Sequence, residues 1–160
     1  MSMKRQTIAT RAATLTAVLF SVGLLFSTPA AYAGSTTPAV TASNAWVRWL
    51  PNGLPAAGYV TLKNNGDKNV DLTEATSPDY DMVMLHQTVS NGSTQQMVMV
   101  DKVTVPAHGT RAIAPGGYHF MLEQAKHAIK VGDTVHMTLD FSDGSKLDVP
   151  FTVKSPAQVQ

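Results

Sequence analysis

Closely spaced turn signals are the feature that most restricts how this chain can fold. Between residues 40 and 153, clusters of Gly, Pro and Asn separate short runs that are rich in β-branched and aromatic residues. This spacing is typical of antiparallel β-sandwiches and barrels. One helical turn is expected at 122–128. We predict an all-β domain with strands at 40–50, 59–63, 70–75, 82–88, 95–105, 110–114, 118–122, 134–141 and 146–153.

The first 33 residues differ from the rest and have the layout of a secretory signal peptide. Three basic residues precede an apolar run that is shorter than the roughly 20 residues needed to cross a bilayer. Ala31-Tyr32-Ala33 then supplies a small-x-small cleavage pattern. An uncleaved membrane anchor is the alternative. We expect cleavage after residue 33, with a linker at 34–39, one domain at 40–153 and a polar tail at 154–160.

Charge and cysteine content exclude several classes of function. Cleavage removes three of the twelve basic residues and none of the eleven acidic ones, so the mature net charge is −2. Nucleic-acid binding requires a basic surface and is not expected. The chain has no cysteine, which excludes disulfide exchange, a lipid anchor on a mature N-terminal cysteine, and the His₂Cys site of an electron-transfer cupredoxin.

Methionine and histidine gather in one part of the chain. Five of the six methionines beyond the leader lie between residues 82 and 121, together with three histidines. Asn91-Gly92 in this region is a strong hairpin signal, because a type I′ turn needs positive φ at both central residues. With Asn91 and Gly92 at those positions, the register pairs His86 with Met97, and Met84 with Met99. The opposite face would then fill the core with Val83, Leu85, Val98 and Val100.

A second pair of possible ligands is His119 and Met121. Residues i and i+2 of an extended segment point to one side, so Phe120 between them should point inward. The preceding Pro115-Gly116-Gly117 forms a loop that could bring this pair over the hairpin. The alternative is that each methionine simply fills the core. Three other histidines lack comparable partners and are left out of the site: His108, His127 and His136.

The proposed donors are all neutral, and this restricts the metal. Thioether sulfur is soft and selects Cu(I), and imidazole is acceptable to copper, whereas hard divalent ions need carboxylates. No carboxylate belongs to this set. We therefore predict a Cu(I) site whose ligands are His86, Met97, His119 and Met121. The sequence leaves open whether Met84 or Met99 also contacts the metal.

These residues resemble the pattern of the periplasmic copper chaperones called PCu(A)C. The family pattern is a His, ten residues, a Met, twenty-one residues and His-x-Met, and His86, Met97, His119 and Met121 match it. The likeness covers nearly all of residues 40–153. It extends through Ala45-Trp46-Val47-Arg48, Ala56-Ala57-Gly58-Tyr59, Leu85-His86 and residues 115–122.

The resemblance implies a fold and a function. The fold would be a cupredoxin-like Greek-key β-sandwich. The protein would be a periplasmic chaperone that holds Cu(I) and delivers it by ligand exchange to the CuA centre of respiratory oxidase subunit II. A Sco-type thioredoxin-like protein often acts beside such chaperones. The tail at 154–160 has neither His nor Met, which speaks against a second, Cu(II) site there.

Other functions remain as alternatives. A copper storage or tolerance protein would use the same ligands, and a metal-free structural or adhesion sandwich would make their spacing accidental. An enzyme is not expected, because no nucleophile motif such as Gly-x-Ser-x-Gly occurs. Asp79 and Asp81 beside a proline are typical of a solvated loop.

Overall fold

The computed structural model describes residues 39–51, 53–92 and 94–158. The predicted signal peptide at 1–33 and nearly all of the predicted linker lie outside the described residues. The ten strands of the described part are β1 (Val40–Arg48), β2 (Ala56–Asn64), β3 (Val70–Thr76), β4 (Tyr80–Asn91), β5 (Thr94–Met99), β6 (Val103–Val105), β7 (Thr110–Ile113), β8 (Tyr118–Ala125), β9 (Thr134–Phe141) and β10 (Lys146–Lys154).

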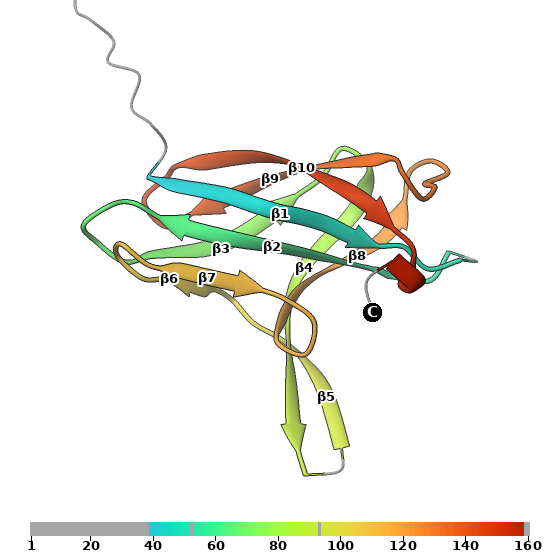
Figure 1. Cartoon of the computed structure of the whole chain (residues 1–160), viewed down its shortest axis with the longest axis horizontal. Helices are drawn as coiled ribbons and strands as arrows, with labels where there is room; N and C mark the ends of the chain where they lie inside the picture. Colours follow the sequence, from blue (N-terminus) through green and yellow to red (C-terminus); the bar gives the residue numbers. More distant parts are fainter. Residues whose placement is uncertain (1–38, 52, 93, 159–160) are drawn as a thin grey trace, which may run out of the picture. The chain divides into compact units, whose positions relative to one another are not determined.

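The strands form a curved sheet in which neighbours are mostly antiparallel (Figure 1). Their order is β5-β4-β8-β2-β1-β10-β9-β3-β6, and β7 pairs with β2. β1 and β10 pair in parallel. The rings of Phe120 on β8 and Phe151 on β10 meet edge to face, with centroids 6.1 Å apart. Strands that are well separated in the sheet order therefore share one core.

The core follows from the alternation of apolar residues along the strands. In β9, Val135, Met137 and Leu139 are buried, while their neighbours along the strand are at least partly exposed. Successive side chains of a strand point to opposite faces, so this pattern places one face of β9 against the core. β10 shows the same pattern in its second half, through Val149, Phe151 and Val153. Met137 is thus a core methionine.

Two predictions of local structure were wrong. The expected helical turn at 122–128 is absent, because β8 continues to Ala125. Leu122 is fully buried there and pairs with both Val83 and Ala56. The strand expected at 95–105 is divided into β5 and β6, and β6 pairs with β3. The described helix is the 3-10 turn Pro156–Gln158, and no helix among the described residues is long and apolar enough to cross a membrane.

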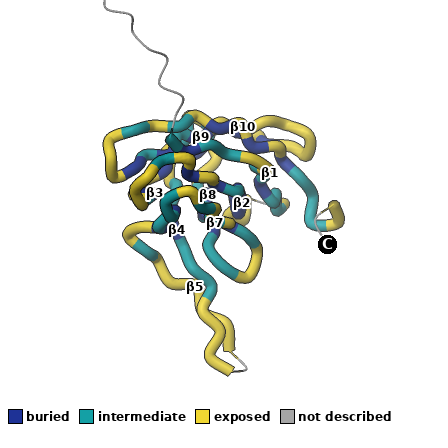
Figure 2. Tube along the Cα trace, turned by 60° about the vertical axis from the view of Figure 1, so that its left-hand side comes forward, coloured by how far each residue is buried: buried dark blue, intermediate teal, exposed yellow. Residues whose placement is uncertain are grey.

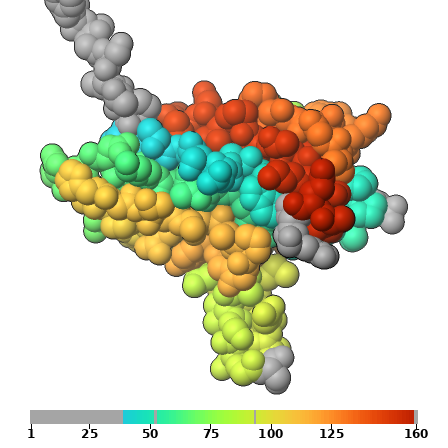
Figure 3. All heavy atoms as spheres, viewed as in Figure 1, coloured from blue at the N-terminus to red at the C-terminus, as the bar shows by residue number. Residues whose placement is uncertain are grey.

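The hairpin of β4 and β5 projects from the body of the domain (Figure 3). Every residue of β5 is exposed, and Figure 2 shows both strands becoming exposed toward the turn. The prediction that Val98 fills the core was therefore wrong, whereas Leu85, nearer the body on β4, is buried. The distal half of this hairpin depends on its own pairing and not on core packing.

Candidate metal centre

β4 is the central strand of the candidate site. Its His86 lies opposite His119 of β8 on one side and opposite Met99 of β5 on the other. The two imidazole rings have centroids 5.7 Å apart and are inclined by 75°. The two histidines singled out from the sequence are thus direct cross-strand neighbours.

The predicted hairpin register was wrong by two residues. Met97 lies opposite Thr88 instead of His86, and Met84 lies opposite Met121 of β8. A shift of two residues preserves the face to which each side chain points, because strand side chains alternate with period two. Met97 therefore remains on the face that carries His86. The physical reason for the error is that Asn91 pairs with Thr94. Asn91 is therefore the last residue of β4 and not a central residue of the turn.

The expected position of β8 also needs correction. The sequence suggested that His119 and Met121 arrive through a loop over the hairpin. They instead occupy a strand that lies in the sheet, hydrogen-bonded to β4 on the side away from β5. Phe120 points inward as predicted and is fully buried. The packing of Phe120 thereby fixes the direction in which His119 and Met121 point.

A hollow of about 240 Å³ brings three of the four predicted ligands together. Met97, His119 and Met121 all border it, and Arg48 and Leu54 complete part of its wall. The fourth, His86, lies beside His119 as described above. A neighbouring hollow of about 210 Å³ is also bordered by Met97 and His119. The predicted set is therefore one cluster in space, although it comes from three strands.

The two histidines differ in their surroundings. His119 is only 6% exposed, and this burial lowers its pKa, as do the nearby His86 and Arg48, against an opposing backbone hydrogen bond with Gly117. A lowered pKa keeps the imidazole neutral, which is the form that binds a metal. The Nδ1 atom of His86 is buried and has no hydrogen-bond partner. Buried polar atoms normally have a partner, so a bound metal ion would account for this one.

The thioethers differ as well. Met97 is 65% exposed, whereas Met121 is half-buried between its partners on β2 and β4. The set thus combines a sheltered side, His119 and Met121, with an exposed methionine. Two imidazole and two thioether donors form a neutral ligand set, which fits Cu(I).

An aromatic and cationic layer next to the site was not identified as functional from the sequence. The guanidinium of Arg48 lies 5.8 Å from the ring centre of Tyr59, which itself packs against Trp46 at 4.4 Å. Lys154 covers the other ring, 5.6 Å from the centre of Trp46. Arg48 borders both hollows at His119. The sequence signals for this layer were the two family-like stretches that contain Trp46, Arg48 and Tyr59.

The other histidines have different environments. His127 Nε2 lies 2.9 Å from Asp79 Oδ1, and His108 Nε2 lies 2.9 Å from Asp67 Oδ1. His136 pairs with Pro150 in the β9–β10 ladder. Within the described ranges, no three His, Cys, Asp or Glu side chains gather as a metal site would require. A metal centre in this part of the chain therefore needs the methionines.

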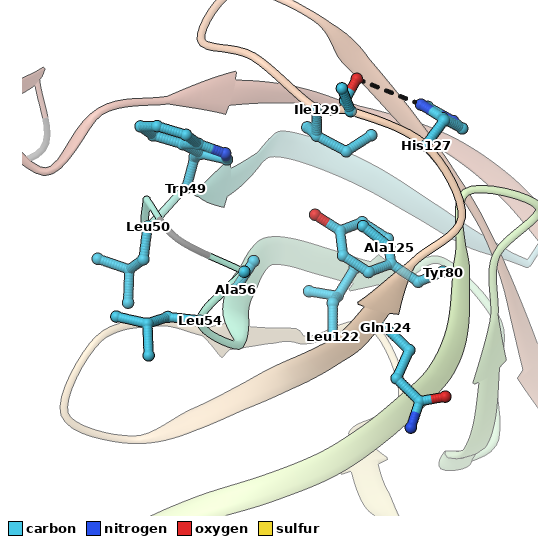
Figure 4. A pocket seen from close by; sticks show the side chains of 12 residues that line it. Trp49, Leu50, Leu54, Ala56, Tyr80, Leu122, Gln124, Ala125, His127 and Ile129 are labelled. Carbon is cyan, nitrogen blue, oxygen red and sulfur yellow. Dashed lines mark hydrogen bonds between the residues drawn. The ribbon is translucent and has the colours of Figure 1, made fainter.

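A larger hollow, of about 420 Å³, adjoins the hollow at the site and shares Leu50, Leu54 and Ala56 with it (Figure 4). Trp49 and Leu54 border it from the β1–β2 connection, and Tyr80 and Ile129 border it from other segments. No methionine borders this cavity, and its histidine is His127, which is engaged with Asp79. It lacks the donor set of a soft-metal site.

A protein family model and a related protein both match most of this chain. The family model described as "LpqE-like: Putative lipoprotein LpqE-like" matches residues 40–153. The chain is 34% identical over 156 residues to "Putative lipoprotein Lxx21020" of Leifsonia xyli subsp. xyli, which covers 95% of this chain and 93% of that protein.

Solved structures show the same fold. The Cu(I) form of DR1885 from Deinococcus radiodurans is 37% identical and covers 76% of this chain and 83% of that chain, with a TM-score of 0.59. The copper-bound PCuAC domain from PmoF2 is 24% identical and covers 74% of this chain and 94% of that chain, with a TM-score of 0.61. The predicted cupredoxin-like β-sandwich is thereby confirmed.

Proposed function

We propose that this chain, which belongs to the LpqE-like family, is a copper chaperone that holds one Cu(I) ion tightly through His86, Met97, His119 and Met121. The resemblance to PCu(A)C proteins noted in the sequence is confirmed by the structural neighbours. The observation that carries the proposal is that Met97, His119 and Met121 of β5 and β8 border one cavity, with His86 of β4 directly beside His119. Copper in the solved relatives agrees with the ion expected from the ligands.

The ligand chemistry supports Cu(I) over other ions. Thioether sulfur is a poor ligand for hard divalent cations, and two such donors with two imidazoles form a neutral set. Cu(II) prefers nitrogen and oxygen ligands in tetragonal geometry. The cation Arg48 beside His119 further disfavours the more highly charged ion, because it borders the same cavity. The site thus holds copper in one oxidation state.

Unequal exposure of the ligands supports transfer to a partner protein. Met97 is the exposed ligand, and it lies on a strand that contributes little to the core. A ligand of the acceptor replaces the Met97 sulfur on copper, while His119 and Met121 keep the ion in place. One copper–ligand bond forms as another breaks, and the oxidation state stays the same.

The acceptor and compartment follow from the family resemblance. We infer delivery in the periplasm to the CuA centre of cytochrome oxidase subunit II, with a Sco-type thioredoxin-like protein as a second participant. The expected signal peptide at 1–33 agrees with this compartment. When the Cu(I)-loaded chain is mixed with the copper-free soluble domain of subunit II, two Cu(I) ions should pass to each acceptor, and one-electron oxidation with added ferricyanide should then develop the absorption bands of mixed-valence CuA. Tight Cu(I) binding without any transfer would instead favour copper storage or tolerance.

Competition titration tests the binding site itself. Cu(I) is partitioned between the protein and a chromophoric chelator, and we expect one tightly held ion per chain. His119→Ala should weaken binding by more than roughly a hundredfold, and Met97→Leu by about tenfold. For comparison, loss of a residue that only orients a ligand typically costs about 10–100-fold in metal affinity. His108→Ala is the matched control, since His108 is exposed and paired with Asp67. Equal affinities in all three variants would contradict the assignment.

A further inference from the structure

Two methionines outside the proposed ligand set lie on the same face of the sheet. Met84 is opposite Met121, and Met99 is opposite His86. Directly opposed residues have Cβ atoms about 4.5–5.5 Å apart on one face. Each extra thioether is therefore the direct neighbour of one proposed ligand. Six soft or borderline donors form one continuous patch, and a single Cu(I) ion uses at most four of them.

Core packing does not explain both of these methionines. Met99 is 69% exposed on a strand in which every residue is exposed, and Met84 is half-buried. By contrast, Met137 is buried in the core and shows what a packing methionine looks like in this fold. An exposed thioether held beside a metal ligand is available for binding.

Met84 and Met99 border a hollow of their own, of about 250 Å³. It is distinct from the cavity that Met97, His119 and Met121 share, because none of those three residues borders it. Glu74 and Asp101 also border it. Two neutral soft donors select Cu(I), and nearby carboxylates attract a monovalent cation to the entrance.

We propose that Met84 and Met99 form a second, weaker Cu(I) site from which the ion passes to or from the four-ligand site. The proposal rests on the proposed function, since it assigns a route to the same ion. Movement between the sites exchanges one copper–sulfur bond for a bond to His86 or Met121, with no change of oxidation state and no proton released. Lacking imidazole, the second site should bind at least about tenfold more weakly than the first.

Ag(I) titration followed through the methionine methyl groups tests this directly. Ag(I) imitates Cu(I) and does not change oxidation state, and the methyl signals of the purified protein are assigned by single Met→Leu variants. The first equivalent should shift Met97 and Met121, and the second should shift Met84 and Met99. Met82, opposite Glu123, and the core residue Met137 are internal controls and should remain in place.

The double variant Met84→Leu/Met99→Leu should lose the second step and keep the first. Its affinity for the first Cu(I) should change by less than about threefold, because neither residue is a ligand of the first site and leucine nearly conserves the volume of methionine beside His86 and Met121. Its transfer of Cu(I) to a chelator should slow severalfold, and Met82→Leu should leave the rate unchanged. Unchanged Met137 signals verify the fold of each variant.

The outcomes separate this proposal from the proposed function. If the protein binds one equivalent and no more, or if Met84 and Met99 shift together with Met97 during the first equivalent, the second site is disproved and the chaperone function stands. If neither equivalent binds, both proposals fail. Loss of the second step in the Met82→Leu variant would also overturn the assignment to Met84 and Met99.

Discussion

β8 and β5 both carry proposed ligands of the candidate site, yet they belong to very different surroundings. β8 lies between β4 and β2, and its Phe120 and Leu122 are fully buried. β5 is an edge strand of the projecting hairpin, and all of its residues are exposed. The difference suggests a division of labour, in which β8 holds a preorganised pair of donors and β5 presents the donors that exchange.

The largest expected contrast is in stability. Phe120→Ala should lower the free energy of unfolding by about 3–5 kcal/mol, because it opens a cavity where Phe120 meets Phe151. Val98→Ala on β5 should change the same quantity by less than about 0.5 kcal/mol, since this side chain lies outside the core. Urea denaturation monitored by circular dichroism measures both. Similar losses in the two variants would show that the stability of the core depends on β5 as much as on β8.

Gly58 of β2 packs closely against Phe120 and Leu122 of β8 and so helps to hold β8 in position. A Cβ atom at Gly58 would lie 3.3 Å from Leu122 Cδ1 and from the Cβ of Phe120. Gly58→Ala should therefore cost roughly 1–3 kcal/mol of stability through overpacking. It should also weaken Cu(I) binding, because β8 must shift to relieve the contact. Wild-type Cu(I) affinity in a destabilised Gly58→Ala protein would indicate that the position of β8 is not critical for the ligands.

Replacing a glycine by alanine in the β4–β5 hairpin should affect only the hairpin itself. Gly92 has φ of +69° and nothing near its Cβ position, so Gly92→Ala costs roughly 1 kcal/mol through the left-handed backbone alone. Amide hydrogen exchange of β5 should accelerate, while exchange in β8 and β9 stays the same. Gly53→Ala is the matched control, with φ of +70° and equally open surroundings in the β1–β2 connection. Faster exchange of β5 in this control would mean that the hairpin responds to distant strain.

The smallest expected effect is a pH dependence of stability that arises from the His127–Asp79 pair, which lies outside both strands. The hydrogen bond to Asp79 raises the pKa of His127. Burial tends to raise the pKa of Asp79, but hydrogen bonds from His127 and the His136 backbone outweigh it and lower that pKa. The raised His pKa gives stability that is lost as the pH rises through it, and the lowered Asp pKa gives stability that is lost as the pH falls through it.

The charged pair should therefore stabilise the fold chiefly between about pH 4 and pH 6.5, the ordinary values of the two groups. His127→Gln should lower the melting temperature slightly at pH 5.5 and have less effect at pH 8.5. His108→Gln controls for the loss of an exposed imidazole. Copper affinity at a fixed pH should be the same in both variants, because neither residue borders the candidate metal centre. A larger loss at pH 8.5 than at pH 5.5 would reverse the expected sign.

The sequence predicted strands best where burial enforced a period of two. The strand at 134–141 was predicted with the observed limits, because its buried residues alternate regularly. The hairpin register failed for the opposite reason. An exposed hairpin has no buried face to penalise a slip, so its pairing is weakly specified by pattern. The helix expected at 122–128 failed because Leu122 extends β8 through contacts that are distant in the sequence.

The sequence by itself determined the chemistry of the candidate site. It supplied two imidazoles and two thioethers at a characteristic spacing, and alternation along the strand already placed His119 and Met121 on one face. Tertiary structure decided which residues are neighbours. The pairing of β4 with β8 set His86 beside His119, and burial separated the sheltered Met121 from the exposed Met97. Pairing between distant strands depends on the packing of the whole core, which local sequence patterns do not contain.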